Sequence, residues 1–159
     1  VQGLEDGMPE TEEEGFRAFV YRARKPFDPM KLQAFGNRSW PGVVRAKGFF
    51  WLATRPDYVG ELSHAGAIVR TERMGRWWAS VPSERWPQDP GFVNYMKPYL
   101  DPVWGDRRQE LVFIGADPMN ETKIRSELDE CLIDTSVFEP KLWRDLQDPF
   151  AHWDQQAAA

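Results

Sequence analysis

The segment that most constrains the fold is 43–54 (VVRAKGFFWLAT), which carries the longest strand pattern of the chain. It contains five consecutive apolar residues, Phe49–Ala53. An uninterrupted apolar run inside a strand is typical of a strand that is buried on both of its faces. We therefore expect this segment to lie within a sheet and to be covered from both sides.

Further strand patterns are rich in aromatic and β-branched side chains, and in chain order they are 16–24, 62–70, 76–81 and 109–115. Alternation in the first of them places Phe19 and Tyr21 on one face. The second and third are expected to pair as a hairpin that closes around Met74 and Gly75.

Helices are predicted where a capping side chain precedes apolar residues at helical spacing. Asp28, followed by proline, begins a short helix that reaches Phe35. The strongest helix is capped by Asp117 or Asn120, and its apolar face consists of Ile124, Leu128, Cys131 and Leu132. Two shorter helices are expected, one opening at Asp89-Pro90 and one at Pro140.

Strands that are joined by both hairpins and helices indicate the α+β class. We predict an antiparallel sheet of four to five strands with helices packed mainly on one face. The expected topology is a ferredoxin-like split βαβ arrangement with an added hairpin.

A length of 159 residues corresponds to one domain. We expect an acidic linker or tail over 1–15, a folded domain over 16–150 and a frayed tail over 151–159. No run of 18 apolar residues is present, so no membrane-spanning helix is expected, and the N-terminus has no secretory signal pattern. A single cysteine, Cys131, excludes an internal disulfide and favours a reducing compartment such as the cytoplasm.

Charge is unevenly distributed along the chain. Residues 1–14 contain six acids and no base, whereas residues 15–47 contain eight bases and one acid, Asp28. The net charge of −5 and the pI of about 5.1 argue against a nucleic-acid partner. The basic block is a candidate for binding phosphate or an acidic partner. Alternatively, its side chains are simply exposed or pair with the acidic C-terminal part.

No motif for a reaction is found, and we assign no catalytic residue. The segment closest to a P-loop, 42–48 (GVVRAKG), has lysine before glycine, lacks a following hydroxyl and lies inside a strand. A nucleophile elbow and a dinucleotide fingerprint are also absent. Zinc sites need three or four cysteine or histidine ligands at short spacing, and His64, Cys131 and His152 are scattered.

These isolated residues have ordinary structural interpretations. His64 is expected to be a hydrogen-bonded structural histidine and is only a weak candidate for a metal ligand. Cys131 lies on the apolar face of its helix, where it suits core packing. The eight tryptophans have no regular spacing and are expected to anchor the core and the loops.

Four strings together resemble the C-terminal domain of the CobW family. They are 19–27 (FVYRARKPF), 40–54 (WPGVVRAKGFFWLAT), 105–115 (GDRRQELVFIG) and 128–132 (LDECL). The resemblance covers about residues 16–150. It implies a place among P-loop GTPases that deliver metals, zinc or cobalt among them, for metal homeostasis, cobalamin biosynthesis or nitrile hydratase maturation.

In that family the Walker motifs and a Cys-x-Cys-Cys metal motif belong to an N-terminal GTPase domain. This chain contains neither and begins with Val1 rather than methionine, so we expect a C-terminal domain separated from its GTPase, or one that is separately encoded. GTP, Mg and Zn or Co are therefore implied for the full-length family only. We expect no cofactor and no metal site in this chain.

The leading hypothesis is a non-catalytic interaction or regulatory domain of a GTP-dependent metal chaperone. Its expected partner is its own N-terminal GTPase domain or a metal-dependent client protein, with no nucleic acid, no membrane and no preferred oligomeric state indicated. One alternative is an independent enzyme or small-ligand module that uses the 82–105 loop as a lid. Another is an autonomous metal carrier built from His64, His152 and carboxylates.

The residues proposed for partner or phosphate binding lie on or near two strands. Arg45 and Lys47 alternate with Phe49 and Trp51, and residues two apart share a face. Arg107 and Arg108 precede the 109–115 strand, so a sheet end or edge is expected to combine all four charges. Arginine and tryptophan are residue types that often contribute strongly to binding at interfaces. The competing interpretation is that Trp51 is core and that the charges form internal pairs.

We predict that the isolated chain neither binds nor hydrolyses GTP. The physical reason is that its sequence has no glycine loop before a helix to gather the β- and γ-phosphates. Titration calorimetry with GTP and magnesium checks this, and saturable binding that persists after further purification would refute it.

Overall fold

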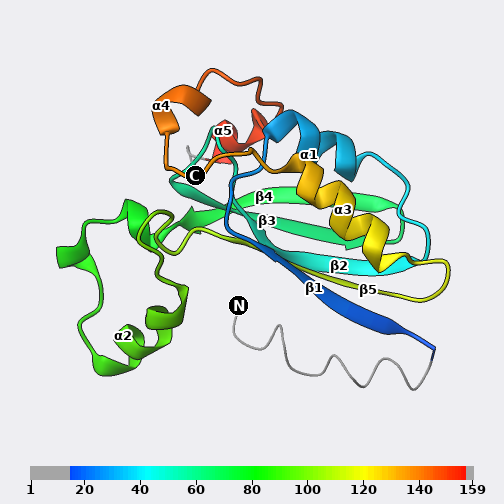
Figure 1. Cartoon of the computed structure of the whole chain (residues 1–159), viewed down its shortest axis with the longest axis horizontal. Helices are drawn as coiled ribbons and strands as arrows, with labels where there is room; N and C mark the ends of the chain where they lie inside the picture. The colour runs from blue at the N-terminus through cyan, green and yellow to red at the C-terminus, as the bar shows by residue number, and fades with distance from the viewer. Residues whose placement is uncertain (1–14, 157–159) are drawn as a thin grey trace.

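The computed structural model describes residues 15–156 and shows one five-stranded antiparallel sheet in the order β1-β5-β2-β3-β4 (Figure 1). The strands are β1 (Arg17–Ala23), β2 (Val43–Phe50), β3 (Tyr58–Ala65), β4 (Ile68–Arg76) and β5 (Gln109–Gly115). The two polypeptide ends that flank this region, 1–14 and 157–159, are outside the described residues. The acidic tail predicted over 1–15 therefore falls almost wholly outside them.

The split βαβ unit of the predicted topology is present. β1 and β2 are both antiparallel to β5 and hence parallel to each other, with β5 inserted between them. Helix α1 (Pro29–Gly36) makes the crossover, and the β3–β4 hairpin extends the sheet. The second helix of the core, α3 (Glu121–Cys131), follows β5. The α+β class is thus confirmed.

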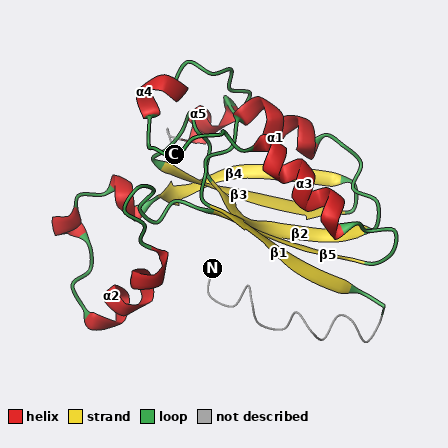
Figure 2. Cartoon of the chain, viewed as in Figure 1, coloured by secondary structure: helices red, strands yellow, loops and turns green. Residues whose placement is uncertain are grey.

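Helices α1 and α3 lie side by side on one face of the sheet (Figures 1 and 2). Both begin as their sequences predict. The Asp28 carboxylate accepts hydrogen bonds from the backbone N–H groups of Met30 and Lys31, at 3.0 and 3.2 Å. Asn120, rather than Asp117, caps α3 by accepting from the N–H of Lys123 at 3.0 Å. The remaining helices are α2 (Pro90–Met96), α4 (Pro140–Trp143), α5 (His152–Gln156) and the 3₁₀ turns Trp78–Ser80, Ser83–Arg85 and Lys97–Tyr99.

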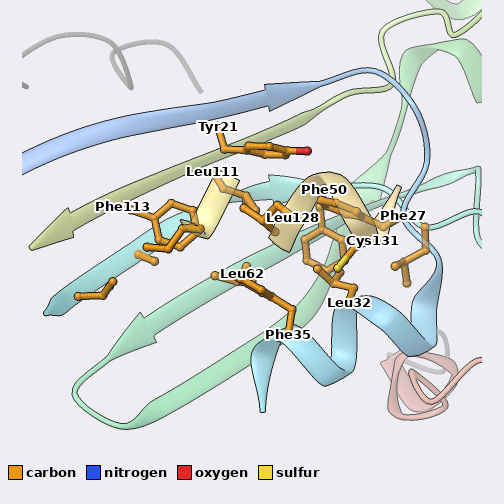
Figure 3. Close-up of a cluster of buried hydrophobic side chains, with 14 of the residues drawn as sticks. Tyr21, Phe27, Leu32, Phe35, Phe50, Leu62, Leu111, Phe113, Leu128 and Cys131 are labelled. Atoms are coloured by element: carbon orange, nitrogen blue, oxygen red, sulfur yellow. The ribbon is translucent and has the colours of Figure 1, made fainter. Parts of the chain in front are cut away.

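The main core fills the space between these two helices and the sheet (Figure 3). Phe19 and Phe113 stack there with ring centroids 5.1 Å apart, and Leu128 and Cys131 of α3 pack with them. The burial of Phe19 and Tyr21 confirms that they share the inner face of β1. Burial of Cys131 raises the pKa of its thiol to about 11, so this cysteine is inert core packing.

A second buried cluster lies on the opposite face of the sheet, at the end where β2 finishes. It consists of Phe49, Trp51, Ala53, Trp77, Trp104 and Trp143. Phe49 and Phe50 point to opposite faces because they are neighbours in a strand, and each enters a different cluster. The apolar run Phe49–Ala53 is therefore covered on both sides, although the regular strand ends at Phe50.

The hairpin lies elsewhere than predicted. Its strands are β3 and β4, and the turn falls at Gly66 and Ala67, where Gly66 has a φ of +66°. Met74 and Gly75 are inside β4, next to a register shift against β3. The prediction around Met74 and Gly75 was wrong because the small residues near Gly66 were assigned to a strand, whereas the glycine there forms the turn.

The predicted frayed tail from 151 onward is also corrected as far as Gln156. Trp153 of α5 is fully buried against Phe50 and Phe150. Its ring lies over Gly60, where an added Cβ would be 2.7 Å from Cη2 of Trp153. Arg55 fixes the segment by ion pairs with Asp148 and Asp154, at 2.7 and 2.8 Å. The folded domain therefore continues beyond the predicted limit of 150.

The buried side chain of Gln109 connects β5 to the segments that follow β1 and β2. The carboxamide of Gln109, which has no exposed surface, accepts a hydrogen bond from the N–H of Trp51 at 2.8 Å. It also donates to the carbonyl oxygens of Lys25 and Trp51, at 2.9 and 3.0 Å. Buried backbone groups need such partners, because leaving one unpaired costs about 1–3 kcal/mol.

We predict that Gln109→Leu lowers the free energy of unfolding by about 2–4 kcal/mol, since it leaves the Trp51 N–H and the Lys25 carbonyl without this partner. Urea unfolding of the chain measures the change. Gln33→Leu, at an exposed position of α1, is the matched control and should change stability by less than about 0.5 kcal/mol. Equal unfolding free energies for Gln109→Leu and the unmodified chain would contradict the role given to Gln109.

Candidate docking face

The sheet face opposite α1 and α3 is open over most of its area among the described residues (Figure 1). Strand register places its side chains in rows that run across the sheet. The residues of these rows, which we call the open face, are Ala18, Val20 and Arg22 of β1; Glu110, Val112 and Ile114 of β5; Arg45, Lys47 and Phe49 of β2; Glu61, Ser63 and Ala65 of β3; and Ile68, Arg70 and Glu72 of β4.

An apolar strip occupies the β1 and β5 side of the open face. It is formed by Ala18, Val20, Val112 and Ile114, in which Ala18 is paired with Ile114 and Val20 with Val112. Val112 is 6% exposed and the other three are half-buried. Farther across the sheet, Ile68 is 59% exposed. The open face therefore presents hydrophobic surface that α1 and α3 do not cover.

A basic strip lies beside the apolar one. Lys47 is in register with Val112 on one side and with Ser63 on the other, and Arg70 is the next residue of that row. Arg45 occupies the neighbouring row, opposite Ile114. All three basic side chains are exposed, and none of them forms an ion pair with a residue in 15–156.

Other members of the basic block do pair internally, as the competing interpretation of that block expected. The pairs are Arg17–Asp117, Arg22–Glu110, Lys25–Asp134 and Arg38–Glu127, with N–O distances of 3.2 to 3.6 Å. Arg45 and Lys47 thus differ from most of their neighbours in sequence. Arg70 belongs with them, and sequence reasoning missed it because only the β3–β4 register places it in their row.

Trp51 does not belong to this surface. It has no exposed area, and its indole N–H donates to the carbonyl of Arg24 at 2.9 Å. Its ring packs against Trp104 and Trp143, with centroids 5.9 and 6.1 Å away. The alternation that placed Trp51 beside Lys47 stops at Phe50, where β2 ends, so Trp51 is part of the interior.

Arg107 is also buried and is used within the domain. Its guanidinium donates to the carbonyl of Pro56 and the hydroxyl of Ser80, at 2.6 and 2.9 Å. The same group lies over the ring of Phe138, 4.4 Å from the centroid. Burial lowers the pKa of Arg107, which the nearby carboxylates of Asp57 and Asp106 partly oppose.

Arg108 is 9% exposed and faces the second buried cluster. One guanidinium nitrogen, Nη1, donates to the carbonyl of Asp106 at 3.0 Å. The guanidinium lies over the rings of Tyr99 and Phe49, at 3.9 and 4.9 Å from their centroids. Burial lowers the pKa of Arg108, while Glu110 acts in the opposite direction.

The four predicted charges therefore do not form one cluster. Lys47 lies opposite Val112, whereas Arg108 precedes β5 by one residue, which separates them by roughly 13 Å along the strand. Arg45 is farther still, opposite Ile114. The structure brings Arg45 and Lys47 together on the open face and keeps Arg107 and Arg108 at the other end of the sheet.

His64 faces the α1–α3 side of the sheet. It is 5% exposed and stacks on Trp40 with ring centroids 4.6 Å apart. Burial lowers its pKa below the ordinary value, so the imidazole is neutral at neutral pH. Its Nδ1 atom is buried and has no hydrogen-bond partner among residues 15–156. Across residues 15–156, no group of three or more His, Cys, Asp or Glu side chains is placed to hold a metal ion.

Comparison with known proteins identifies the chain's relatives. Residues 16–132 match the family described as "Cobalamin synthesis protein cobW C-terminal domain". The chain is 38% identical over 147 residues to "Zinc-regulated GTPase metalloprotein activator 1" of Dictyostelium discoideum, with 89% of this chain and 31% of that protein covered. It is 33% identical over 156 residues to "Zinc chaperone Rv0106" of Mycobacterium tuberculosis, covering 92% of this chain and 37% of that protein.

Among solved structures, the fold is similar to that of the Zn(II)-bound YjiA GTPase from E. coli. The TM-score is 0.50 at 14% identity, and the match covers 77% of this chain and 31% of that one. The chain spans about a third of the length of these relatives. The extent of the family match and the identity to both curated relatives show that the chain belongs to the CobW C-terminal domain family.

Proposed function

We propose that this chain is a docking and regulatory domain, without catalysis of its own, of a GTP-dependent zinc chaperone. The observation that carries the proposal is the open face, where an apolar strip lies beside three exposed basic side chains that have no ion-pair partner within 15–156. An uncovered sheet face with this composition has the surface chemistry of a binding interface.

The side chains of the open face indicate what kind of surface its partner presents. Val112 and Ile114, with Ala18 and Val20 beside them, favour an apolar patch of similar size on the partner. Arg45, Lys47 and Arg70 favour carboxylates at its border. Such charge complementarity gives orientation and association rate, while the apolar centre contributes to affinity.

The GTPase domain is the partner that fits the comparisons best. The relatives are named as a GTPase metalloprotein activator and a zinc chaperone, and about two-thirds of their length lies outside the matched region. In this proposal GTP and magnesium bind to that other domain. A metal-dependent client protein is the second candidate for the open face, and the cytoplasm is the compartment we propose.

Zinc enters this proposal as cargo. The described residues do not provide a site for it, because His64 is buried against Trp40 and no group of three or more His, Cys, Asp or Glu side chains in 15–156 is placed to hold a metal ion. No step of the proposed function is therefore assigned to a metal bound by this domain. Nor do the described helices include one that is long and apolar enough to cross a membrane.

We predict that reversing two charges, Arg45→Glu with Lys47→Glu, weakens docking to the GTPase domain by about tenfold or more, because both groups would then repel the partner's carboxylates. The coding sequence adjacent to this chain is expected to supply that P-loop domain. Calorimetric or surface-based titration of the separately produced GTPase domain measures the affinity.

The control is Lys31→Glu with Lys141→Glu, which makes the same change in net charge at exposed positions on α1 and α4. It should leave docking unchanged, and melting temperatures should show that both double variants are folded. Unchanged docking of a folded Arg45→Glu, Lys47→Glu variant would contradict the proposal. A large fall in its melting temperature would instead show a structural role for the pair.

A further inference from the structure

A cavity of about 240 Å³ lies where the open face meets the segment that carries α2. Its apolar walls include Phe49, Met74, Trp77, Trp78, Tyr95 and Met96. The charged residues that line it are Arg76, Asp106 and Arg108. Figure 1 shows that α2 lies apart from α1 and α3, at the end of the sheet where β4 finishes. This cavity is thus separate from the apolar and basic strips.

Arg108 is an unusual group to find in such a place. Its side chain is 11% exposed, and its buried Nε atom has no hydrogen-bond partner among residues 15–156. Nε forms an ion pair with Oε1 of Glu110 at 3.7 Å, too long for a hydrogen bond, and the same oxygen lies 3.6 Å from Nε of Arg22. The only hydrogen bond of the guanidinium within residues 15–156 is that from Nη1 to the Asp106 carbonyl.

A buried guanidinium with unused donors is costly, because charge-assisted hydrogen bonds normally compensate for its removal from water. Asp106 does not supply them. Its two carboxylate oxygens accept from the backbone N–H groups of Trp78 and Ala79, at 3.0 and 2.9 Å. The Tyr99 and Phe49 rings stabilise the cation by their π faces but accept no conventional hydrogen bond.

We propose that this cavity is a binding site for a small monocarboxylate with an apolar, preferably aromatic, body. The carboxylate accepts hydrogen bonds from Arg108, and the body lies among Phe49, Trp77 and Met96. A guanidinium matches a planar carboxylate in geometry, and the exposed Arg76 is a second positive charge on the walls. An engineered cavity of 150 Å³ holds benzene, so about 240 Å³ suits a ligand of roughly nine or ten non-hydrogen atoms.

The exposed side chains among the lining residues mark the opening of the cavity. Met74 is 57% exposed and Tyr95 is 37% exposed, whereas Phe49, Trp77 and Met96 are buried. Met74 and Tyr95 therefore form the mouth and the buried rings form the floor. This site does not depend on the docking function, since its residues lie outside the apolar strip and the Arg45, Lys47 and Arg70 group.

Benzoate and benzamide are the probes, because they have the same size and differ in charge. We expect benzoate to bind with a dissociation constant of about 1 mM, as suits a ligand of nine non-hydrogen atoms, and benzamide at least about tenfold more weakly. Two-dimensional NMR of the indole N–H groups should show shifts at Trp77 and Trp78. Trp40, on the α1–α3 side, is the internal control and should not shift.

Arg108→Met should abolish the preference for benzoate over benzamide, and Met74→Trp should block both probes by filling the mouth. Arg70→Met, which removes an exposed arginine of the same sheet, should leave binding unchanged. Should Arg108→Met fail to fold, Met74→Trp still tests the site, because Met74 is largely exposed. Equal affinity for the two probes, equal binding of inorganic phosphate, shifts confined to other tryptophans, or no saturation at tens of millimolar would each overturn the proposal.

Discussion

The Gln109 carboxamide is the interaction on which the arrangement of this domain depends. It joins the first residue of β5 to Trp51, just past the end of β2, and to Lys25, just past the end of β1. These three strands are adjacent in the sheet, so one side chain fixes how their ends leave it. Trp51, whose backbone is hydrogen-bonded to Gln109, belongs to the second buried cluster. The buried backbone of Trp51 is thereby paired at both its N–H and its carbonyl.

Much of the local structure could be predicted because local chemistry determines it. Asp28, Asp89 and Asn120 cap helices where their side chains reach the next backbone N–H groups, and those contacts span only two or three residues. The 109–115 strand also has the predicted limits, because its continuous apolar run Leu111–Ile114 is typical of a strand inside a sheet. The turn at Gly66 was misplaced because a glycine flanked by alanines carries no apolar period to separate strand from turn.

The candidate site was less predictable, because it depends on pairing between distant segments. Arg45 and Arg108 have the same side chain, but one is exposed beside Ile114 and the other is enclosed by rings from β2 and the α2 segment. No periodicity in the sequence around either arginine shows which one is buried. Arg70 lies in the same row as Lys47 because both are paired with Ser63. Only the strand register shows this, since the two residues are far apart in sequence. Likewise, Trp153 fits into the core because Gly60, more than ninety positions earlier, has no side chain there.

That last contact has an evolutionary consequence. Gly60 has no side chain, and the rings of Phe50 and Trp153 occupy the space that a side chain would need. A substitution at either position alone is therefore expected to destabilise the fold, at Gly60 by a clash and at Trp153 by a void beside Phe50 and Phe150. A larger residue at 60 should therefore occur among homologous sequences only where the residues at 50 and 153 are both smaller.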